Sequence, residues 1–254
     1  MNIERSEPSR GVCQLTLARP PANALSPELL GELGAALDDA VEEEARAIVV
    51  AGRPGMFSAG LDVPHLLELD RDAMATFWQT FFDLLAQLAR SPIPVGAAIT
   101  GHCPAGGMVL SLYTDFRIAA AGDFKLGLNE VQVGLPMPPI IFHAFRRLIG
   151  PRAAEQLGVT GELVSPERAL ALGLVDEVVS ADAVVERAVE RAARLVAMPP
   201  RALADTRRLA RADLIELFDN LAAESPDAIN AVWFSEETRT AMRALVARLA
   251  EKRQ

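Results

Sequence analysis

An uncharged segment, residues 91–114, is the feature that most constrains how this chain can fold, because it contains no Asp, Glu, Lys or Arg. Its length alone would allow a membrane span. However, three prolines and four glycines divide it into short runs, of which PVGAAI (94–99) is fully apolar. Runs this short favour a buried strand, a loop and a buried helix. We therefore expect a folded core at this segment and no membrane span.

Short apolar strands alternate with helices through the first 120 or so residues. Strands are predicted at 12–17, 47–51, 94–99 and 116–120. Helices are predicted at 26–43, 71–90 and around 107–113. The first helix has Ser26 as its N-cap and Pro27 at its first helical position, a favourable combination. Strands that alternate with helices are typical of an α/β layer arrangement.

The character of the sequence changes after Ile140, where helices rich in Ala, Leu, Arg and Glu take over. One further strand, LVDEVV (174–179), interrupts them. Beyond residue 195 the pattern is helical, punctuated by MPP (198–200) and SPD (225–227). No low-complexity linker separates this part from the rest. We therefore predict a core at residues 1–195 and a helical region at 196–254 that packs on the core.

Charge and cysteine content exclude several classes of function. The 254 residues carry a net charge of −9, which argues against a general nucleic-acid binder or an anionic-membrane binder. Cys13 and Cys103 lie far apart with no CxxC spacing, which indicates a reducing compartment and no structural zinc site. The start, MNIERSEPSRG, lacks the apolar core of a signal peptide. These features predict a cytoplasmic protein without a metal site.

Two glycine-containing loops, MFSAGLD (56–62) and HCPAGG (102–107), each follow a buried strand and precede a helix. Backbone N–H groups at helix N-termini have no partner within the helix, so two such loops that face each other can offer two donors to one oxygen. Glycines that make tight turns explain the same residues more simply. Asp62 is by default a helix N-cap. Neither loop contains a phosphate-binding motif.

Several separated motifs together resemble the crotonase (enoyl-CoA hydratase/isomerase) superfamily. They occur in the expected order and cover nearly the whole chain, as NALSPELL (23–30), FSAGLD (57–62), CPAGG (103–107), TDFRIAA (114–120), GLNEVQVGLP (127–136) and GPRAAEQLGVTGELVSPERALALGLVDEVV (150–179). The stretches RPGMFSAGLD, CPAGG and GLNEVQVG look most like the mitochondrial-type Δ3,Δ2-enoyl-CoA isomerase branch.

The resemblance implies a fold and a mode of binding. Members fold as a spiral of ββα turns with a C-terminal α-helical oligomerisation region, usually as trimers or dimers of trimers. They bind an acyl-CoA thioester, need no cofactor beyond the CoA of the substrate, and stabilise its enolate with two backbone N–H groups. By position in the motifs, these donors are Leu61 and Gly106.

The number of acids in the motifs bears on the activity. By resemblance, hydratases use two glutamates, and the corresponding residues here are Val109 and Glu130. Isomerisation requires one base, so the resemblance implies a Δ3,Δ2-enoyl-CoA isomerase with Glu130 as the proton shuttle. Burial in this apolar run is expected to raise the pKa of Glu130. Two alternatives stay open: a hydratase or other crotonase-family enzyme that recruits an acid from 68–72, and a non-catalytic acyl-CoA-binding protein. The acids considered for that recruitment are Glu68, Asp70 and Asp72.

Substrate contacts also follow from the resemblance. The residues expected to bind CoA or the acyl group are Ala22, Ala24, Ser58, Ala59, Gly60, Leu61, Asp62 and Gly106. Arg53 and Lys252 are candidates for the CoA phosphates, with a solvated surface arginine as the simpler interpretation of Arg53. The aromatic residues expected in the acyl pocket, or else simply in the core, are Phe77, Trp78, Phe81 and Phe82. Pro138 and Pro139 depart from the pattern, so the preferred chain length stays open.

Overall fold

Two β-sheets receive strands in alternation along the chain. The computed structural model describes residues 2–219 and 226–251. The larger sheet has the order β1-β2-β3-β5-β7-β9, with β1 antiparallel to β2 and all other neighbours parallel. Its strands are β1 (Ile3–Ser9), β2 (Val12–Leu17), β3 (Ala47–Ala51), β5 (Val95–Ile99), β7 (Phe116–Ala120) and β9 (Glu177–Val179). The smaller, parallel sheet consists of β4 (Gly55–Met56), β6 (Gly101–Pro104) and β8 (Leu126–Gly127).

Each turn of the chain contributes one strand to the larger sheet, one to the smaller sheet, and then a helical segment. The helical segments are α2 (Val63–Leu66) with α3 (Arg71–Arg90), then α4 (Gly106–Leu112), then η1 (Glu130–Val133) with α5 (Pro139–Thr160). Between β5 and β6 the backbone passes so close to β4 that a Cβ on Gly101 would lie 2.0 Å from the carbonyl carbon of Gly55. This repeated plan confirms the predicted crotonase-like spiral of ββα turns.

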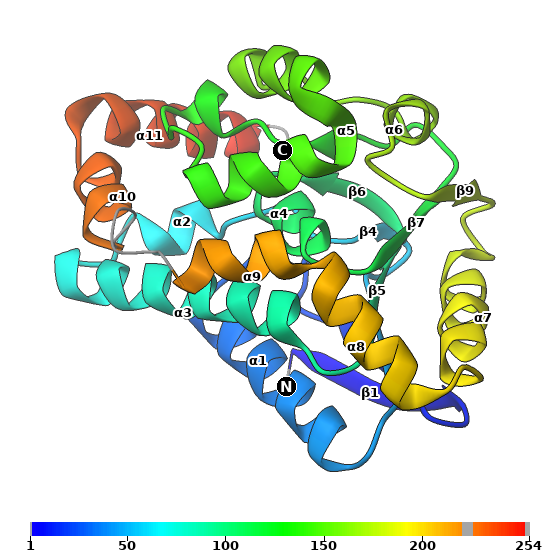
Figure 1. The fold of residues 1–254 in the computed structure, drawn as a ribbon. Helices are drawn as coiled ribbons and strands as arrows, with labels where there is room; N and C mark the ends of the chain where they lie inside the picture. The colour runs from blue at the N-terminus through cyan, green and yellow to red at the C-terminus, as the bar shows by residue number, and fades with distance from the viewer. Residues whose placement is uncertain (1, 220–225, 252–254) are drawn as a thin grey trace.

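Helices cover both faces of the larger sheet, whose central strands β3, β5 and β7 are buried throughout. On one face lie α1 (Pro27–Glu42), α3 and α4, and on the other lies α7 (Val184–Val196) (Figure 1). The α7 face is built mainly from small residues, including Ala188 and Ala192. The sheet is therefore a central layer, and the segments that leave its strands lead toward α2, α4 and η1.

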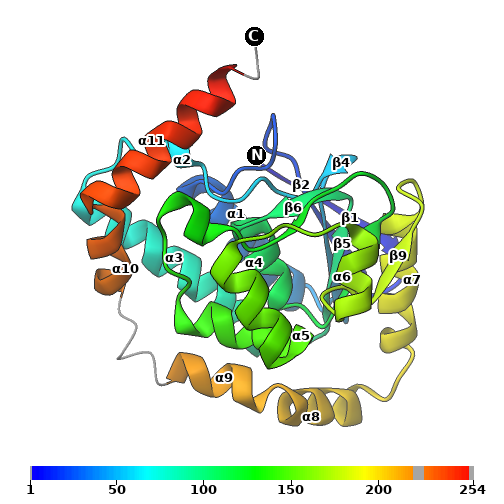
Figure 2. The same ribbon diagram turned by 90° about the horizontal axis from the view of Figure 1, so that it is seen from above.

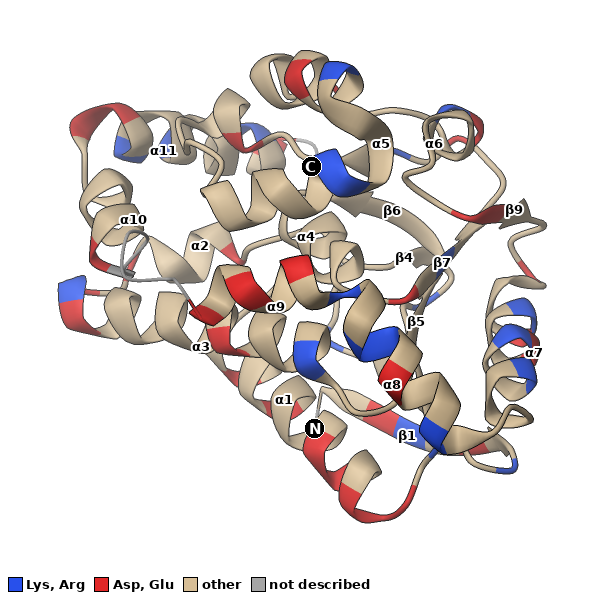
Figure 3. Ribbon diagram, viewed as in Figure 1, with Lys and Arg blue, Asp and Glu red and all other residues tan. Residues whose placement is uncertain are grey.

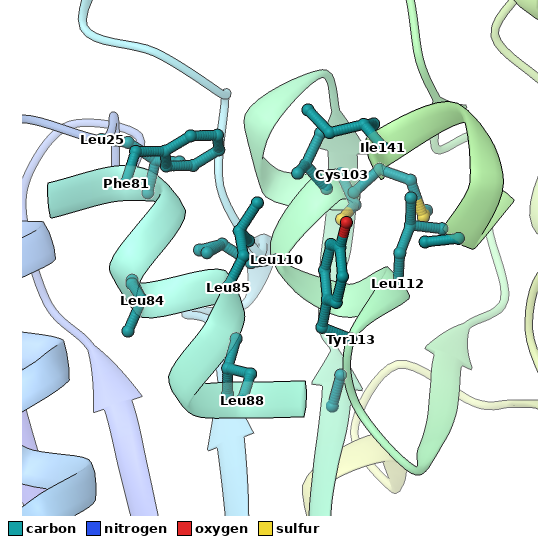
Figure 4. Packing of buried hydrophobic residues seen from close by; sticks show 14 of the residues in the cluster. Leu25, Phe81, Leu84, Leu85, Leu88, Cys103, Leu110, Leu112, Tyr113 and Ile141 are labelled. Carbon is teal, nitrogen blue, oxygen red and sulfur yellow. The ribbon is translucent and has the colours of Figure 1, made fainter. Parts of the chain in front are cut away.

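The main core lies between α3, α4 and the start of α5, and it is almost entirely apolar (Figure 4). Leu84, Leu85 and Leu88 of α3 lie on one side of it, across from Leu110 and Leu112 of α4. The one hydroxyl visible in this view, that of Tyr113, donates to the carbonyl of Ile140 at 2.9 Å. The uncharged segment 91–114 is thus a core strand, a second-sheet strand and a buried helix. Among the described residues no helix is long and apolar enough to cross a membrane.

The C-terminal third of the chain is helical. Its helices are α6 (Pro166–Leu172), α7, α8 (Pro200–Ala210), α9 (Ala212–Asp219), α10 (Pro226–Trp233) and α11 (Glu236–Glu251). Helix α9 lies beside α3 and α5, α10 lies against α3, and α11 contacts α2 and η1 (Figures 1 and 2). Helices after residue 195 therefore pack against α2, α3, α5 and η1.

Ion pairs made by buried arginines connect α8 and α9 to this core. The Asp115 carboxylate accepts hydrogen bonds from Arg207 Nε (2.6 Å) and Nη2 (2.9 Å), and from Arg211 Nη1 (3.4 Å). The same carboxylate accepts from the backbone N–H of Val95 at 2.7 Å. Burial lowers the pKa of Arg211 to about 10, and the charge of Asp115 opposes that shift. Arg207 and Arg211 are thus largely buried, whereas Arg208 beside them is exposed. Figure 3 colours the basic positions of α7 and α8 blue.

The predicted strands and helices are found with boundaries shifted by only a few residues, while several short strands were missed. The charged segment Ile3–Ser9 forms β1, although its residues show no apolar strand pattern. The residues expected to be glycine loops contain β4 and β6. These two strands are short and are identified by their pairing with each other, which no local pattern encodes.

Candidate active site

Hydrogen bonds join the loop after β2 to the loop after β4. The N–H of Ala59 donates to Ala22 O at 3.0 Å, the N–H of Leu25 donates to Gly60 O at 2.8 Å, and the N–H of Asp62 donates to Leu25 O at 3.0 Å. These backbone bonds bring together the motifs at 23–30 and 57–62, as the resemblance implied.

Buried side chains strengthen the same connection. Asn23 Nδ2 donates to Phe57 O at 3.0 Å. Ser58 Oγ donates to Asn23 O at 2.7 Å and accepts from the N–H of Gly60 at 3.2 Å. The Ser58 hydroxyl therefore holds the loop in shape, and its side chain is fully buried.

The loop after β4 lies directly against the start of α4. Gly60 has a φ of +86°, and a Cβ built on it would lie 3.0 Å from Ala105 Cβ and 3.2 Å from the backbone nitrogen of Gly106. Ala105, the residue before α4, has a φ of +48°, an uncommon and strained value for alanine. Strain of this kind is concentrated at functional sites.

Two backbone N–H groups lie free where these loops meet. The N–H groups of Leu61 and Gly106 donate to no acceptor among residues 2–219 and 226–251. Gly106 is the first residue of α4, so its N–H has no partner within the helix. A Cβ on Gly106 would lie 3.4 Å from Leu61 Cδ2, which shows that the two candidate donor residues are neighbours.

The short strand β8 brings Glu130 to the same region. Gly127 pairs with Pro104 in the smaller sheet, and its carbonyl accepts from the N–H of Ala105 at 2.8 Å. Glu130, three residues after Gly127, is the first residue of η1. Gly106, immediately after Ala105, is the first residue of α4. The candidate acid and one candidate donor therefore begin two helical segments that leave adjacent strands.

Glu130 is half-buried as a residue, but its carboxyl group reaches into the interior. Its Oε2 is buried without a hydrogen-bond partner among the described residues, and so is Oδ1 of the preceding Asn129. Burial raises the pKa of Glu130 from 4.5 to about 7, although a hydrogen bond to its own backbone opposes the shift. At neutral pH this carboxyl group can therefore both accept and release a proton.

The η1 turn is held from two sides. Gln132 Nε2 donates to Gly161 O at 2.9 Å, at the end of α5. On the other side, Thr238 Oγ1 of α11 donates to Gly134 O at 2.6 Å, and Gly134 is the residue that ends η1. Thr238 is buried. Residues from far along the chain thus fix the turn that carries Glu130.

The remaining predicted contact residues have varied surroundings. Asp62 caps α2, accepting from the N–H of His65 at 3.3 Å, and pairs with Arg19 Nη2 at 2.5 Å. Arg53 is an exposed partner of Glu4, which agrees with a solvated surface arginine. Lys252 lies outside the described residues. The aromatic residues of α3 form a buried cluster of contacting rings, made of Phe77, Trp78, Phe81 and Phe82.

The residues considered for a second acid differ sharply from Glu130. Val109 is buried within α4, one turn after Gly106. Glu68, Asp70 and Asp72 are exposed, and Asp70 caps α3 by accepting from the N–H of Ala73 at 2.9 Å.

Within the described part of the chain, no group of three or more His, Cys, Asp or Glu side chains is arranged to hold a metal ion.

Three residues of this region were not singled out from the sequence. Arg19 reaches both Asp62 and the carbonyl of Ala24, with 3.1 Å to the latter. Asn129 precedes Glu130, and Thr238 contacts Gly134, which ends the same turn. Asn129 belongs to the motif GLNEVQVGLP, but Thr238 lies more than a hundred residues from Glu130, and no local pattern connects them.

Comparison with known proteins agrees with this architecture. The sequence profile described as enoyl-CoA hydratase/isomerase matches residues 7–253. Human enoyl-CoA delta isomerase 1, mitochondrial, is 35% identical over 204 residues, which are 79% of this chain and 68% of the human protein. Probable enoyl-CoA hydratase EchA17 of Mycobacterium tuberculosis is 33% identical over 230 residues, which are 88% of this chain and 85% of that protein.

The crystal structure of human mitochondrial Δ3-Δ2-enoyl-CoA isomerase matches the fold with a TM-score of 0.95, at 29% identity and with 100% of both chains covered. The chain therefore belongs to the enoyl-CoA hydratase/isomerase family. Within the crotonase superfamily, it is similar to the Δ3,Δ2-enoyl-CoA isomerase branch, which the sequence motifs also indicated.

Proposed function

We propose that this protein is a Δ3,Δ2-enoyl-CoA isomerase, which moves the double bond of a 3-enoyl-CoA to the 2-position with Glu130 as the only proton shuttle. The observation that carries the proposal is the buried Glu130 carboxyl group, whose Oε2 has no hydrogen-bond partner among the described residues and whose pKa is raised to about 7. The residue that would supply a second acid in this region is the apolar Val109. Valine can neither accept a proton nor orient a water molecule.

The proposed reaction needs one base and two hydrogen-bond donors. The Glu130 carboxylate removes a proton from C2, and the electron pair of that C–H bond moves into the thioester to give a dienolate. The negative oxygen accepts hydrogen bonds from the N–H groups of Leu61 and Gly106, each of which contributes about 3 kcal/mol to transition-state stability. Glu130, now a carboxylic acid, returns the proton to C4, and the thioester carbonyl re-forms.

The contacts of the loops support a binding path for the CoA part of the substrate. In this proposal, Ala22 to Ala24 and Ser58 to Asp62 line that path, with Ser58 acting through loop shape because its hydroxyl is already bonded internally. No cofactor takes part, since CoA belongs to the substrate. We further propose that residues 196–254 contact neighbouring subunits of a trimer or a dimer of trimers, in addition to the core.

The proposal is tested by following the conversion of trans-3-hexenoyl-CoA to the conjugated 2-enoyl product. Replacing Glu130 by Gln keeps the volume but removes the base, so we expect the rate to fall about 10²- to 10⁴-fold. Glu68→Gln, on an exposed residue, is the matched control and should leave the rate unchanged.

Hydration of crotonyl-CoA is measured in parallel. An isomerase with one acid should hydrate this substrate far more slowly than it isomerises the 3-enoyl substrate. Dominant hydration would favour the hydratase alternative. Binding of acyl-CoA with no turnover of either substrate would favour a non-catalytic acyl-CoA-binding protein.

A further inference from the structure

Buried polar atoms without hydrogen-bond partners are concentrated in two places. Seven such side-chain atoms occur among the described residues. Two of them, on Asn129 and Glu130, belong to the catalytic turn proposed above. Four others come from the junction of α3, α10 and α11: Trp78 Nε1, Asn230 Oδ1, Trp233 Nε1 and Arg239 Nη1. Native proteins leave few buried polar atoms unpaired, so four at one helix junction require an explanation.

The four residues lie where α10 contacts α3 and α11. The rings of Trp78 and Trp233 meet edge to face with centroids 6.0 Å apart. Asn230 Nδ2 donates to Arg71 O at 3.0 Å, which joins α10 to the start of α3. Trp78, Trp233 and Asn230 are 3%, 0% and 8% exposed. Their unpaired atoms are therefore shielded from bulk solvent.

Two guanidinium groups belong to the same junction. The guanidinium of Arg71 lies 4.6 Å from the centroid of the Phe234 ring, and that of Arg239 lies 5.4 Å from it. Neither arginine forms an ion pair with a carboxylate of the described residues; Arg71 is exposed and Arg239 is half-buried. The other half-buried or buried arginines here do form such pairs, so among the described residues Arg239 stands out as a cation without an acidic partner.

This junction borders both halves of the proposed catalytic site. Arg239 Nη2 donates to Leu67 O at 3.1 Å, at the end of α2, which follows the loop that carries Leu61. The adjacent Thr238 donates to Gly134, which ends the turn that carries Glu130. The junction therefore contacts both the segment that follows the Leu61 loop and the turn that carries Glu130.

The chemistry of the unpaired atoms favours an anion. Three of them are N–H donors, one of these belongs to a cation, and only Asn230 Oδ1 is an acceptor. Hydrogen bonds from N–H groups to a carboxylate are stronger than those to a neutral oxygen, most of all from a guanidinium. An apolar chain would leave all of these donors unpaired, at a cost in binding free energy.

We propose that the α3–α10–α11 junction binds a carboxylate at the far end of the substrate's acyl chain. The preferred substrate would then be the CoA thioester of a dicarboxylic acid. Trp78, Trp233 and Arg239 donate to that carboxylate, and Arg71 adds positive charge. The proposal deepens the isomerase assignment and rests on it for the reaction, but the binding preference can be measured without any turnover.

Tryptophan fluorescence tests the proposal directly, because the chain has two tryptophans and both lie in this junction. The ligands are a saturated ω-carboxyacyl-CoA and the unsubstituted acyl-CoA of equal length, neither of which can be isomerised. We expect the ω-carboxy ligand to shift the emission and to bind about tenfold more tightly. Since both ligands carry the same CoA phosphates, the difference isolates the far end of the chain.

Two variants remove donors separately. Trp233→Phe keeps a ring but loses the N–H, and Arg239→Gln loses the charge; each should bring the two affinities closer together, with little change for the unsubstituted ligand. Arg152→Gln makes the same charge change at a residue whose side chain is 82% exposed, and should preserve the preference. Equal affinities in the wild type, or a preference that survives in both variants, would overturn the proposal.

Discussion

The Glu130 side chain shows how burial alone can turn an ordinary carboxyl group into a candidate base. No cation of the described residues contributes to its pKa, which removal from water raises to about 7. The exposed acids at 68–72 lack such an environment. A proton shuttle must be basic enough to remove a proton and acidic enough to return it, which requires a pKa near the working pH.

The pKa of Glu130 predicts how activity depends on pH. The carboxylate is the reactive form, so kcat/KM should rise with pH through a midpoint of about 7 and then level off. Initial rates with trans-3-hexenoyl-CoA across this range measure the midpoint. A midpoint near 4.5, the ordinary value for a glutamate, would contradict burial as the controlling factor.

The free energy of unfolding provides an independent check of the same shift. Because the folded pKa is raised, the folded protein binds the proton more tightly than the unfolded chain does, so this contribution to stability is fully present below about 4.5 and is lost as pH rises through about 7. Glu130→Gln removes the titration. The variant should therefore gain up to about 3 kcal/mol over the wild type between these limits. Urea unfolding at both ends of the range measures this difference.

Among the helices and strands, those with a clear pattern in their own residues were predicted from the sequence. Those that are defined by contacts with a distant segment were not. The apolar run 47–51 and the capped helix that begins at Pro27 have the expected pattern in their own residues. The two-residue strand β4 is defined only by its partner β6, and η1 is one turn held by contacts with α5 and α11. The motifs located Glu130, Leu61 and Gly106, but not the residues that hold them.

The contact between α11 and η1 predicts a positioning role for Thr238. Thr238→Val keeps the shape but leaves Gly134 O without this donor, so the Glu130 turn should become less well fixed. We expect kcat to fall about tenfold, equivalent to roughly 1.4 kcal/mol, with KM nearly unchanged.

Thr238→Ser restores the hydroxyl and should recover most of the lost activity. Thr76→Val, which removes a similar hydroxyl on an exposed part of α3, serves as the control and should have no effect. A fall in affinity with unchanged kcat would show that α11 affects substrate binding and does not position the base.

At the scale of the whole molecule, the C-terminal helices are tied to the core by a few buried arginines. Arg207 and Arg211 reach Asp115, which begins the segment leading into β7. This arrangement makes α8 and α9 part of one cooperative unit with the sheet. The composition of the helical region suggested a tail that packs on the core, but it gave no sign of which arginines turn inward.

Removing the shared carboxylate should therefore destabilise the whole molecule. Asp115→Asn leaves two largely buried cations without their anion, and we expect the free energy of unfolding to fall by about 3 kcal/mol. Glu155→Gln, which breaks an exposed pair with Arg152, should change it by less than about 0.5 kcal/mol. Equal urea midpoints for the two variants would contradict a structural role for the arginine group.

The edges of the larger sheet also limit how the molecule can aggregate. Strand β1 forms one edge, and it carries Glu4, Arg5, Glu7 and Pro8. Strand β9 forms the other edge and has three residues. Charges, proline and short length all disfavour the addition of another strand. Although the sheet has five parallel strands beside β1, both of its edges are therefore poor templates for pairing with a strand of another copy.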